Sequence, residues 1–114
     1  MKSINTPTKT GIERGELTLV AFLRAKPGHV EELGRRLQDL VGPTRAESGC
    51  LNYDLHRSND DPSVWMLYEN WRTEKDLDAH FKTAYLEEFL SHLSEVLEGD
   101  MDIRRYAMTS SPAK

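Results

Sequence analysis

The chain has 114 residues, of which 38% are hydrophobic and 30% charged, and its formal net charge is −4. This composition is typical of one soluble globular domain, and the length leaves no room for a second core. No apolar run approaches the roughly 20 residues of a membrane span. An acidic chain without a basic stripe is also not expected to bind nucleic acid. The lone cysteine, Cys50, has no partner for an internal disulfide, and we expect a cytoplasmic protein.

The ends of the chain differ in composition from its middle. Residues 1–15 are polar and lack the apolar core of a secretory signal, which predicts a mobile N-terminal extension. We predict a single domain over residues 16–108 and a loose C-terminal tail over residues 109–114.

The first half of the domain contains two strongly patterned segments. Leu17–Ala25 is apolar on both faces, which predicts a strand that is buried on two sides. After Pro27–Gly28, apolar residues recur three and four apart over Val30–Val41, as expected of an amphipathic helix. Gly42–Pro43 is expected to interrupt that helix, and a short continuation should end at Ser48–Gly49.

A hairpin follows. Cys50–Arg57 alternates in polarity, which predicts a strand with Leu51, Tyr53 and Leu55 on one face. Turn-forming residues fill positions 58–63, and the aromatic and branched run Val64–Trp71 predicts the partner strand. The other face of Cys50–Arg57 carries Asn52, Asp54 and His56, which we interpret as a solvated or interface face rather than a metal site.

The last third of the domain returns to helical spacing. Thr73 is a candidate helix cap, and apolar residues then recur at helical intervals with His80 on the apolar stripe. The helix is expected to bend near Thr83 and to continue to about residue 97, before a final strand over Met101–Met108.

The order strand, helix, strand, strand, helix, strand predicts the α+β class and the ferredoxin-like βαββαβ fold. In this fold an antiparallel four-stranded sheet carries helices on one face. The opposite face needs a cover as well, and back-to-back pairing of two sheets in a homodimer is the simplest arrangement.

With these elements in order, the chain resembles the antibiotic biosynthesis monooxygenase family of small dimeric α/β-barrel proteins, from about residue 17 to residue 106. Four segments carry the resemblance: Lys26–Gly28, Glu47–Tyr53, Tyr68–Trp71, and His80–Thr83 followed by Phe89. Members of this family oxidise quinols and polyketides without metal or flavin, isomerise a signalling molecule, or degrade haem. The haem-degrading members resemble this chain less, because they carry tryptophan where His80 aligns and an axial histidine near Leu90, and His92 lies two positions away.

The resemblance implies a monooxygenase that has no cofactor and oxidises a small aromatic phenol or quinol with molecular oxygen. Such chemistry needs a dry pocket and a base. His80 is the expected proton acceptor, since its unperturbed pKa of about 6.5 suits proton transfer near neutrality. Asp76, one helical turn earlier, is expected to orient it. Six residues are expected to form the pocket wall: Leu19, Tyr53, Leu67, Trp71, Phe81 and Phe89.

Other readings of the same residues stay open. A histidine on an apolar stripe can be a packed residue with one hydrogen bond. We expect Glu69 and Trp65 to have structural roles in the core or the dimer, with Glu69 paired to Arg104 or Arg105 of the same chain or of the second copy. The alternative functions are a non-catalytic small-molecule-binding or stress-response protein on the same dimeric scaffold, and an isomerase of a small metabolite.

Overall fold

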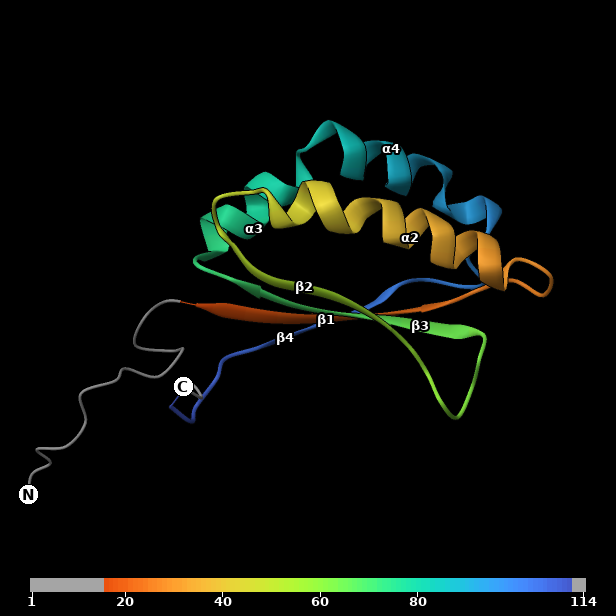
Figure 1. Cartoon of the computed structure of the whole chain (residues 1–114), viewed down its shortest axis with the longest axis horizontal. Helices are drawn as coiled ribbons and strands as arrows, with labels where there is room; N and C mark the ends of the chain where they lie inside the picture. The colour runs from red at the N-terminus through yellow and green to blue at the C-terminus, as the bar shows by residue number, and fades with distance from the viewer. Residues whose placement is uncertain (1–15, 112–114) are drawn as a thin grey trace, which may run out of the picture.

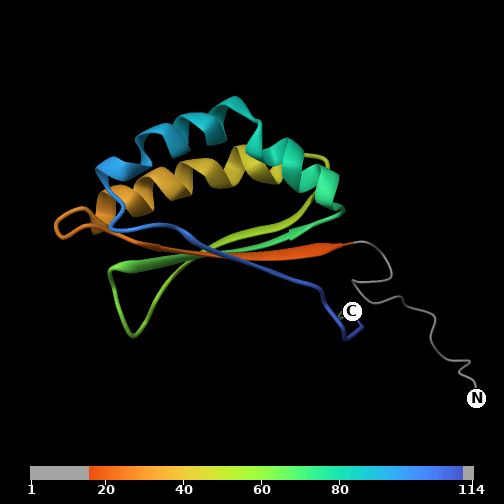
Figure 2. The same cartoon turned by 180° about the vertical axis from the view of Figure 1, so that it is seen from behind.

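Four strands form one antiparallel sheet in the order β2-β3-β1-β4 in the computed structural model, which describes residues 16–111. The predicted N-terminal extension and residues 112–114 of the predicted tail lie outside this range. The elements are β1 (Leu17–Arg24), α2 (Val30–Arg45), β2 (Cys50–Arg57), β3 (Val64–Trp71), α3 (Glu74–Phe81), α4 (Ala84–His92), the 3₁₀ turn η2 (Leu93–Glu95) and β4 (Asp102–Tyr106). The helices lie together over one face of the sheet, as both views show (Figures 1 and 2). The predicted α+β, ferredoxin-like fold is confirmed.

The core lies between this sheet face and the helices. β1 occupies the centre, pairing with β3 on one side and with β4 on the other. Its residues Leu19, Ala21 and Leu23 alternate toward the helices and are buried. Leu19 is opposite Glu69 in β3, and Glu69 is opposite Tyr53 in β2, so one row of the sheet crosses three strands beneath the helices.

Helix α2 does not break where the sequence predicts. The helix is continuous from Val30 to Arg45, with Pro43 inside it, so the expected interruption at Gly42–Pro43 is wrong. Pro43 lies in the last turn, where its missing N–H costs one hydrogen bond. Val41 and Thr44, on either side of Pro43, are buried. Packing of this last turn therefore outweighs the local preference of proline to end a helix.

Strand β2 contains a β-bulge that the alternation did not reveal. The register against β3 shifts between Cys50 and Asn52, so Leu51 falls in the irregularity. The side chain of Leu51 is 48% exposed, whereas Tyr53 is buried. The prediction that Leu51 shares an inward face with Tyr53 is wrong, because one extra residue reverses the side on which a side chain lies.

Two threonine caps divide the second helical segment. The Thr73 hydroxyl accepts a hydrogen bond from the Asp76 backbone N–H at 3.1 Å and begins α3. The Thr83 hydroxyl accepts from the Leu86 N–H at 3.4 Å and begins α4. The single bent helix that the sequence predicts is therefore two shorter helices, which meet at the predicted bend. The 3₁₀ turn η2 follows directly after α4.

Close packing between α2 and β3 depends on a glycine. The Trp65 indole lies against Gly34, where any side-chain carbon would overlap the ring. The indole Nε1–H donates to the backbone oxygen of Val30 at 3.0 Å, near the start of the same helix. Trp65 therefore fixes the distance and rotation of α2 over the sheet.

Among residues 16–111, no helix lies over the opposite face of the sheet (Figures 1 and 2). Val20 and Phe22 of β1, and Met66 and Tyr68 of β3, alternate with the buried residues and are half-buried. The Arg104 guanidinium lies 5.7 Å from the centre of the Phe22 ring on this face. Within residues 16–111, no helix is long and apolar enough to cross a membrane.

Candidate active site

A small cavity lies between the helices and the row of the sheet that carries Glu69. Its free volume is about 30 Å³, close to the share of one water molecule in the liquid. Most of its wall is apolar, with Glu69, His80 and the Tyr53 ring as the residues that carry polar groups. The lining comprises Leu19, Ala21, Leu23, Leu40, Tyr53, Leu67, Glu69, His80, Phe81, Leu86, Phe89, Leu90, Met101 and Ile103.

His80 lies inside this aromatic and apolar environment. It occupies the last turn of α3, one turn after buried Leu77, and only 2% of its surface is exposed. Its ring centre is 4.7 Å from that of Trp71 and 5.6 Å from those of Tyr53 and Phe81. The Thr83 hydroxyl donates to the His80 backbone oxygen at 2.8 Å, so the cap of the next helix holds the same residue.

The carboxylate that orients His80 is Glu47. Its Oε2 lies 2.8 Å from His80 Nδ1, although the two residues are 33 positions apart. Glu47 is part of the turn between α2 and β2, where its N–H donates to Thr44 and its carbonyl accepts from Cys50. The Tyr85 hydroxyl donates to the same oxygen of Glu47.

Sequence reasoning missed Glu47, although it belongs to one of the segments that carry the family resemblance. No period or spacing connects it to His80. The only available signal was an acidic residue in a turn that the fold brings to the end of α3.

Asp76 has a different position from the one predicted. Its carboxylate accepts from Arg72 at 3.0 and 3.1 Å and from the Thr73 hydroxyl at 2.7 Å. It also packs against Gly49, whose carbonyl accepts the Arg72 N–H at 2.8 Å. Glu47 holds the histidine, and Asp76 joins the turn before β2 to the corner that begins α3.

Glu69 is buried, with 4% of its surface exposed. Its Oε1 accepts the Trp71 indole N–H at 2.9 Å. The expected pairing with an arginine of the same chain is wrong: Arg104 bonds Asp102 at 2.9 Å, and Arg105 is 3.6 Å from Glu74. The pKa of Glu69 is raised to about 7: desolvation raises it most, the indole hydrogen bond acts against this, and the nearby charge of Glu47 adds to the increase.

Burial also governs the protonation of the neighbouring rings. Desolvation lowers the pKa of His80, and the hydrogen bond and charge of Glu47 act in the opposite direction. His80 is therefore neutral at physiological pH. With Nδ1–H donated to the Glu47 carboxylate, Nε2 is the ring nitrogen left to accept a proton. Desolvation raises the pKa of the Tyr53 phenol far above its ordinary range, so this hydroxyl stays protonated.

Five of the predicted pocket residues line the cavity: Leu19, Tyr53, Leu67, Phe81 and Phe89. Trp71, the sixth, lies one layer behind, where it contacts the His80 ring and donates to Glu69. Trp65 lies away from the cavity, between β3 and α2. In the part of the chain that the structure describes, no group of three or more His, Cys, Asp or Glu residues is arranged to hold a metal ion.

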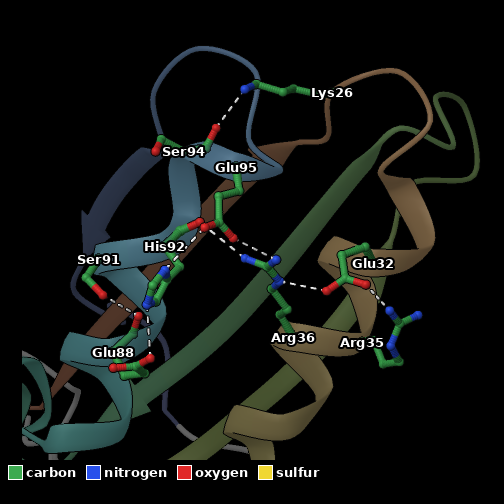
Figure 3. A network of polar contacts seen from close by, with 9 residues as sticks. All are labelled: Lys26, Glu32, Arg35, Arg36, Glu88, Ser91, His92, Ser94 and Glu95. Carbon is green, nitrogen blue, oxygen red and sulfur yellow. Dashed lines mark hydrogen bonds and ion pairs between the residues drawn. The ribbon is translucent and has the colours of Figure 1, made fainter.

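A wider groove of about 570 Å³ is lined by residues of α2, α4 and η2, and Arg36, Glu88, His92 and Glu95 in its wall form ion pairs. Figure 3 shows Arg36 between Glu32 and Glu95, with nitrogen to oxygen distances of 2.9 Å to each. His92 is 3.1 Å from Glu88 and 3.3 Å from Glu95 (Figure 3). Exposed pairs of this kind contribute little stability each. They connect α4 and η2 to α2, and His92 lies among them rather than at the cavity.

Comparison with known proteins places these residues in a family. The sequence matches the family described as antibiotic biosynthesis monooxygenase over residues 17–92. The uncharacterized protein sll1783 of Synechocystis is 28% identical over 95 residues, which are 83% of this chain and 65% of that protein, so the match spans less than two thirds of the relative. The Bacillus subtilis protein named "Putative monooxygenase YcnE" is 30% identical over 89 residues, 78% of this chain and 94% of that protein.

The fold agrees with the sequence match. The crystal structure of PA3566 from Pseudomonas aeruginosa superposes with a TM-score of 0.80 and 34% identity, covering 92% of this chain and 100% of that chain. The segment from β1 to α4, which contains Glu47, Glu69 and His80, is the segment that the family match covers. The chain therefore belongs to the antibiotic biosynthesis monooxygenase family.

Proposed function

We propose that the protein is a monooxygenase that oxidises a small aromatic phenol or quinol, with molecular oxygen as the oxidant and no metal or flavin. The observation that carries the proposal is a neutral, buried histidine, oriented by a carboxylate, at the wall of an apolar cavity. Family membership supports the reaction class, since relatives carry monooxygenase in their names.

The proposed reaction begins with His80. Its Nε2 removes a proton from the substrate, and the Glu47 carboxylate stabilises the imidazolium that forms. The resulting anion is electron-rich and transfers an electron to oxygen, after which the two radicals combine. One oxygen atom stays on the substrate carbon as a carbonyl, and the other leaves as water. The apolar wall favours this course because it excludes water from the anion and from the reduced oxygen.

The cavity must widen for such a substrate. A free volume of about 30 Å³ fits a water or an oxygen molecule, whereas pockets for ring-sized ligands measure about 300 Å³ or more. Phe89 and Leu40 line both this cavity and the outer groove. We propose that rotation of the Phe89 ring joins the two spaces and admits the substrate between α2 and α4.

Oxygen consumption tests the proposal. Purified protein, with a chelator present, is supplied with hydroquinones, dihydroxynaphthalenes and anthrones, beside His80→Gln and the control His29→Gln, at an exposed residue that lines neither space. We expect saturable uptake that His80→Gln lowers by about 100-fold or more and that His29→Gln leaves unchanged. Saturable binding without oxygen uptake would instead indicate the non-catalytic binding protein. Equal turnover by the wild type and His80→Gln would remove the proposed base.

We further propose that the protein forms a homodimer through the sheet face that no helix covers. Val20, Phe22, Met66 and Tyr68 supply an apolar surface there, and Arg104 and Asp102 lie at its edge on β4. Burying such a surface against a second copy supplies the driving force for a two-fold dimer. Light scattering at micromolar concentration should give twice the 13.1 kDa chain mass, and Phe22→Glu should return the monomer. A monomeric wild type would contradict this.

A further inference from the structure

Glu69 bears a proton at the cavity wall, as His80 and Tyr53 do, and the proposed reaction leaves it without a role. Glu69 lines the cavity from the sheet side, and His80 lines it from α3. Oε1 is occupied by the Trp71 indole N–H. Among the described residues, no hydrogen-bond donor meets Oε2. The indole therefore anchors one oxygen of a carboxyl group whose other oxygen is available to a ligand.

The groups that face Glu69 do not supply a cation. Tyr53 is its register partner on β2, and Glu47 lies behind His80. Cys50, also on β2, has a pKa that desolvation raises to about 11, so it is a neutral thiol. Arg105 occupies the same row of the sheet on β4 but is directed to Glu74. Among the residues that the structure describes, no lysine or arginine lines the cavity.

A substrate that loses a proton in this cavity becomes an anion close to Glu69. An anion in the cavity meets no positive side chain other than protonated His80, and a carboxylate at Glu69 would repel it. A carboxylic acid at the same place has the opposite effect, because its O–H donates a strong hydrogen bond to the anion. Keeping an acid neutral in an apolar site so that it can donate is an established use of burial in enzymes.

We propose that Glu69 is a second catalytic group of this cavity, a carboxylic acid that donates a hydrogen bond to a phenol or quinol oxygen and then protonates the departing peroxide oxygen. This assignment rests on the proposed function. It also defines the substrate as uncharged, because a carboxylated or phosphorylated ring would bring a further negative charge to Glu47 and Glu69.

Glu69 acts in the step in which the O–O bond of the peroxide breaks. After oxygen has added, protonated His80 gives its proton to the peroxide anion, so the substrate carbon carries one hydrogen and an O–O–H group and His80 is again neutral. His80 takes the proton from that carbon, and the C–H electron pair forms the C=O bond while the O–O bond breaks. The departing hydroxide receives the proton of Glu69 and leaves as water. Protonated His80 then returns a proton to the Glu69 carboxylate, and both groups are restored.

Infrared difference spectroscopy under argon tests the donor role without turnover. The difference spectrum of wild type minus Glu69→Gln should contain a carboxylic acid C=O band at pH 6 that disappears by pH 9. The difference spectrum of wild type minus Glu88→Gln, a control at an exposed residue, should contain no such band. Adding 1,4-dihydroxynaphthalene should move the Glu69 band. Trp71→Phe removes the indole hydrogen bond that lowers the pKa of Glu69, so its acid band should persist to higher pH, an independent check if Glu69→Gln fails to fold.

The same variants in air test the proton delivery. We expect Glu69→Gln to consume oxygen but release peroxide, with carbonyl product formation lowered about 100-fold or more. Any of three results would overturn the assignment. They are absence of the acid band, an acid band that bound 1,4-dihydroxynaphthalene does not move, and full coupling of oxygen consumption to product formation in Glu69→Gln. If the band moves but the wild type consumes no oxygen, the monooxygenase proposal fails while Glu69 remains a hydrogen-bond donor to the ligand.

Discussion

Replacing Glu69 by glutamine removes one titrating group from the core and keeps the side-chain oxygen that accepts the Trp71 indole N–H. The two side chains have nearly the same volume, so packing around the cavity should be preserved. The variant therefore isolates the free energy of protonating one buried carboxyl group. We expect its stability relative to the wild type to depend on pH in a defined direction.

The direction follows from the raised pKa. In the unfolded chain Glu69 loses its proton near the ordinary 4.5, whereas in the folded protein it keeps the proton up to about 7. Below pH 4.5 both states are protonated, and burial of the acid contributes its full stability. As pH rises through this window the unfolded state releases a proton and the folded state does not, so the wild type loses stability until about pH 7.

The magnitude follows from the same two values. At about 1.4 kcal/mol for each tenfold change in a protonation equilibrium, the full effect is about 3.5 kcal/mol. About 2.5 kcal/mol of it falls between pH 5 and pH 8. Burial lowers the pKa of His80 from 6.5, which destabilises the folded state as pH falls below that value. His80 is present in both proteins, so its contribution cancels in the difference between them.

Urea unfolding at equal protein concentration, at pH 5, 6, 7 and 8, measures this difference. Relative to the wild type, Glu69→Gln should gain about 2.5 kcal/mol between the lowest and the highest pH. Equal concentration matters because dimerisation would add a concentration-dependent contribution to both proteins. A difference that is constant across this range would mean that Glu69 titrates normally in the folded protein, and the reasoning on which its catalytic role depends would fail.

Two further predictions concern α2 and the turn that follows it. Gly34→Ala should destabilise the protein by about 1–3 kcal/mol in urea unfolding, because the new methyl group overlaps the Trp65 ring. Gly42→Ala, in the same helix but with open space around it, should change stability by about 1 kcal/mol at most, and equal effects of the two changes would contradict the packing argument. Glu47→Gln should move the acidic limb of the kcat/KM profile for quinol oxidation to lower pH, because the Glu47 carboxylate raises the pKa of His80. An unchanged profile would remove Glu47 from the site.

Most of the scaffold could be predicted from local patterns. The strand Val64–Trp71, the cap at Thr73 and the bend at Thr83 depend on residues close together in the chain, and the structure has all three where they were expected. Burial of His80 followed from its place on a helical stripe. Each of these features reflects a period of 2 or 3.6 residues or a single capping hydrogen bond, which a sequence displays directly.

The two wrong predictions about α2 and β2 have one physical cause, which is contact between residues far apart in the chain. Proline would end an isolated helix at Gly42–Pro43, but burial of Thr44 on the sheet keeps α2 continuous. The bulge that turns Leu51 outward is one residue of slippage against β3, and alternation alone cannot detect it. In both cases contacts between layers outweigh a local preference.

The sequence by itself determined the order of the elements, the ferredoxin-like class and the inward position of His80, because each depends on the spacing of apolar and polar residues that are close together in the chain. Only the tertiary structure decided which charged groups meet. It brought Glu47 to His80 across 33 positions, gave Glu69 an indole N–H instead of an arginine, and left Asp76 at a structural corner. Partners of buried polar groups depend on how far side chains reach between packed layers, and that distance is fixed by the fold as a whole rather than by spacing along the chain.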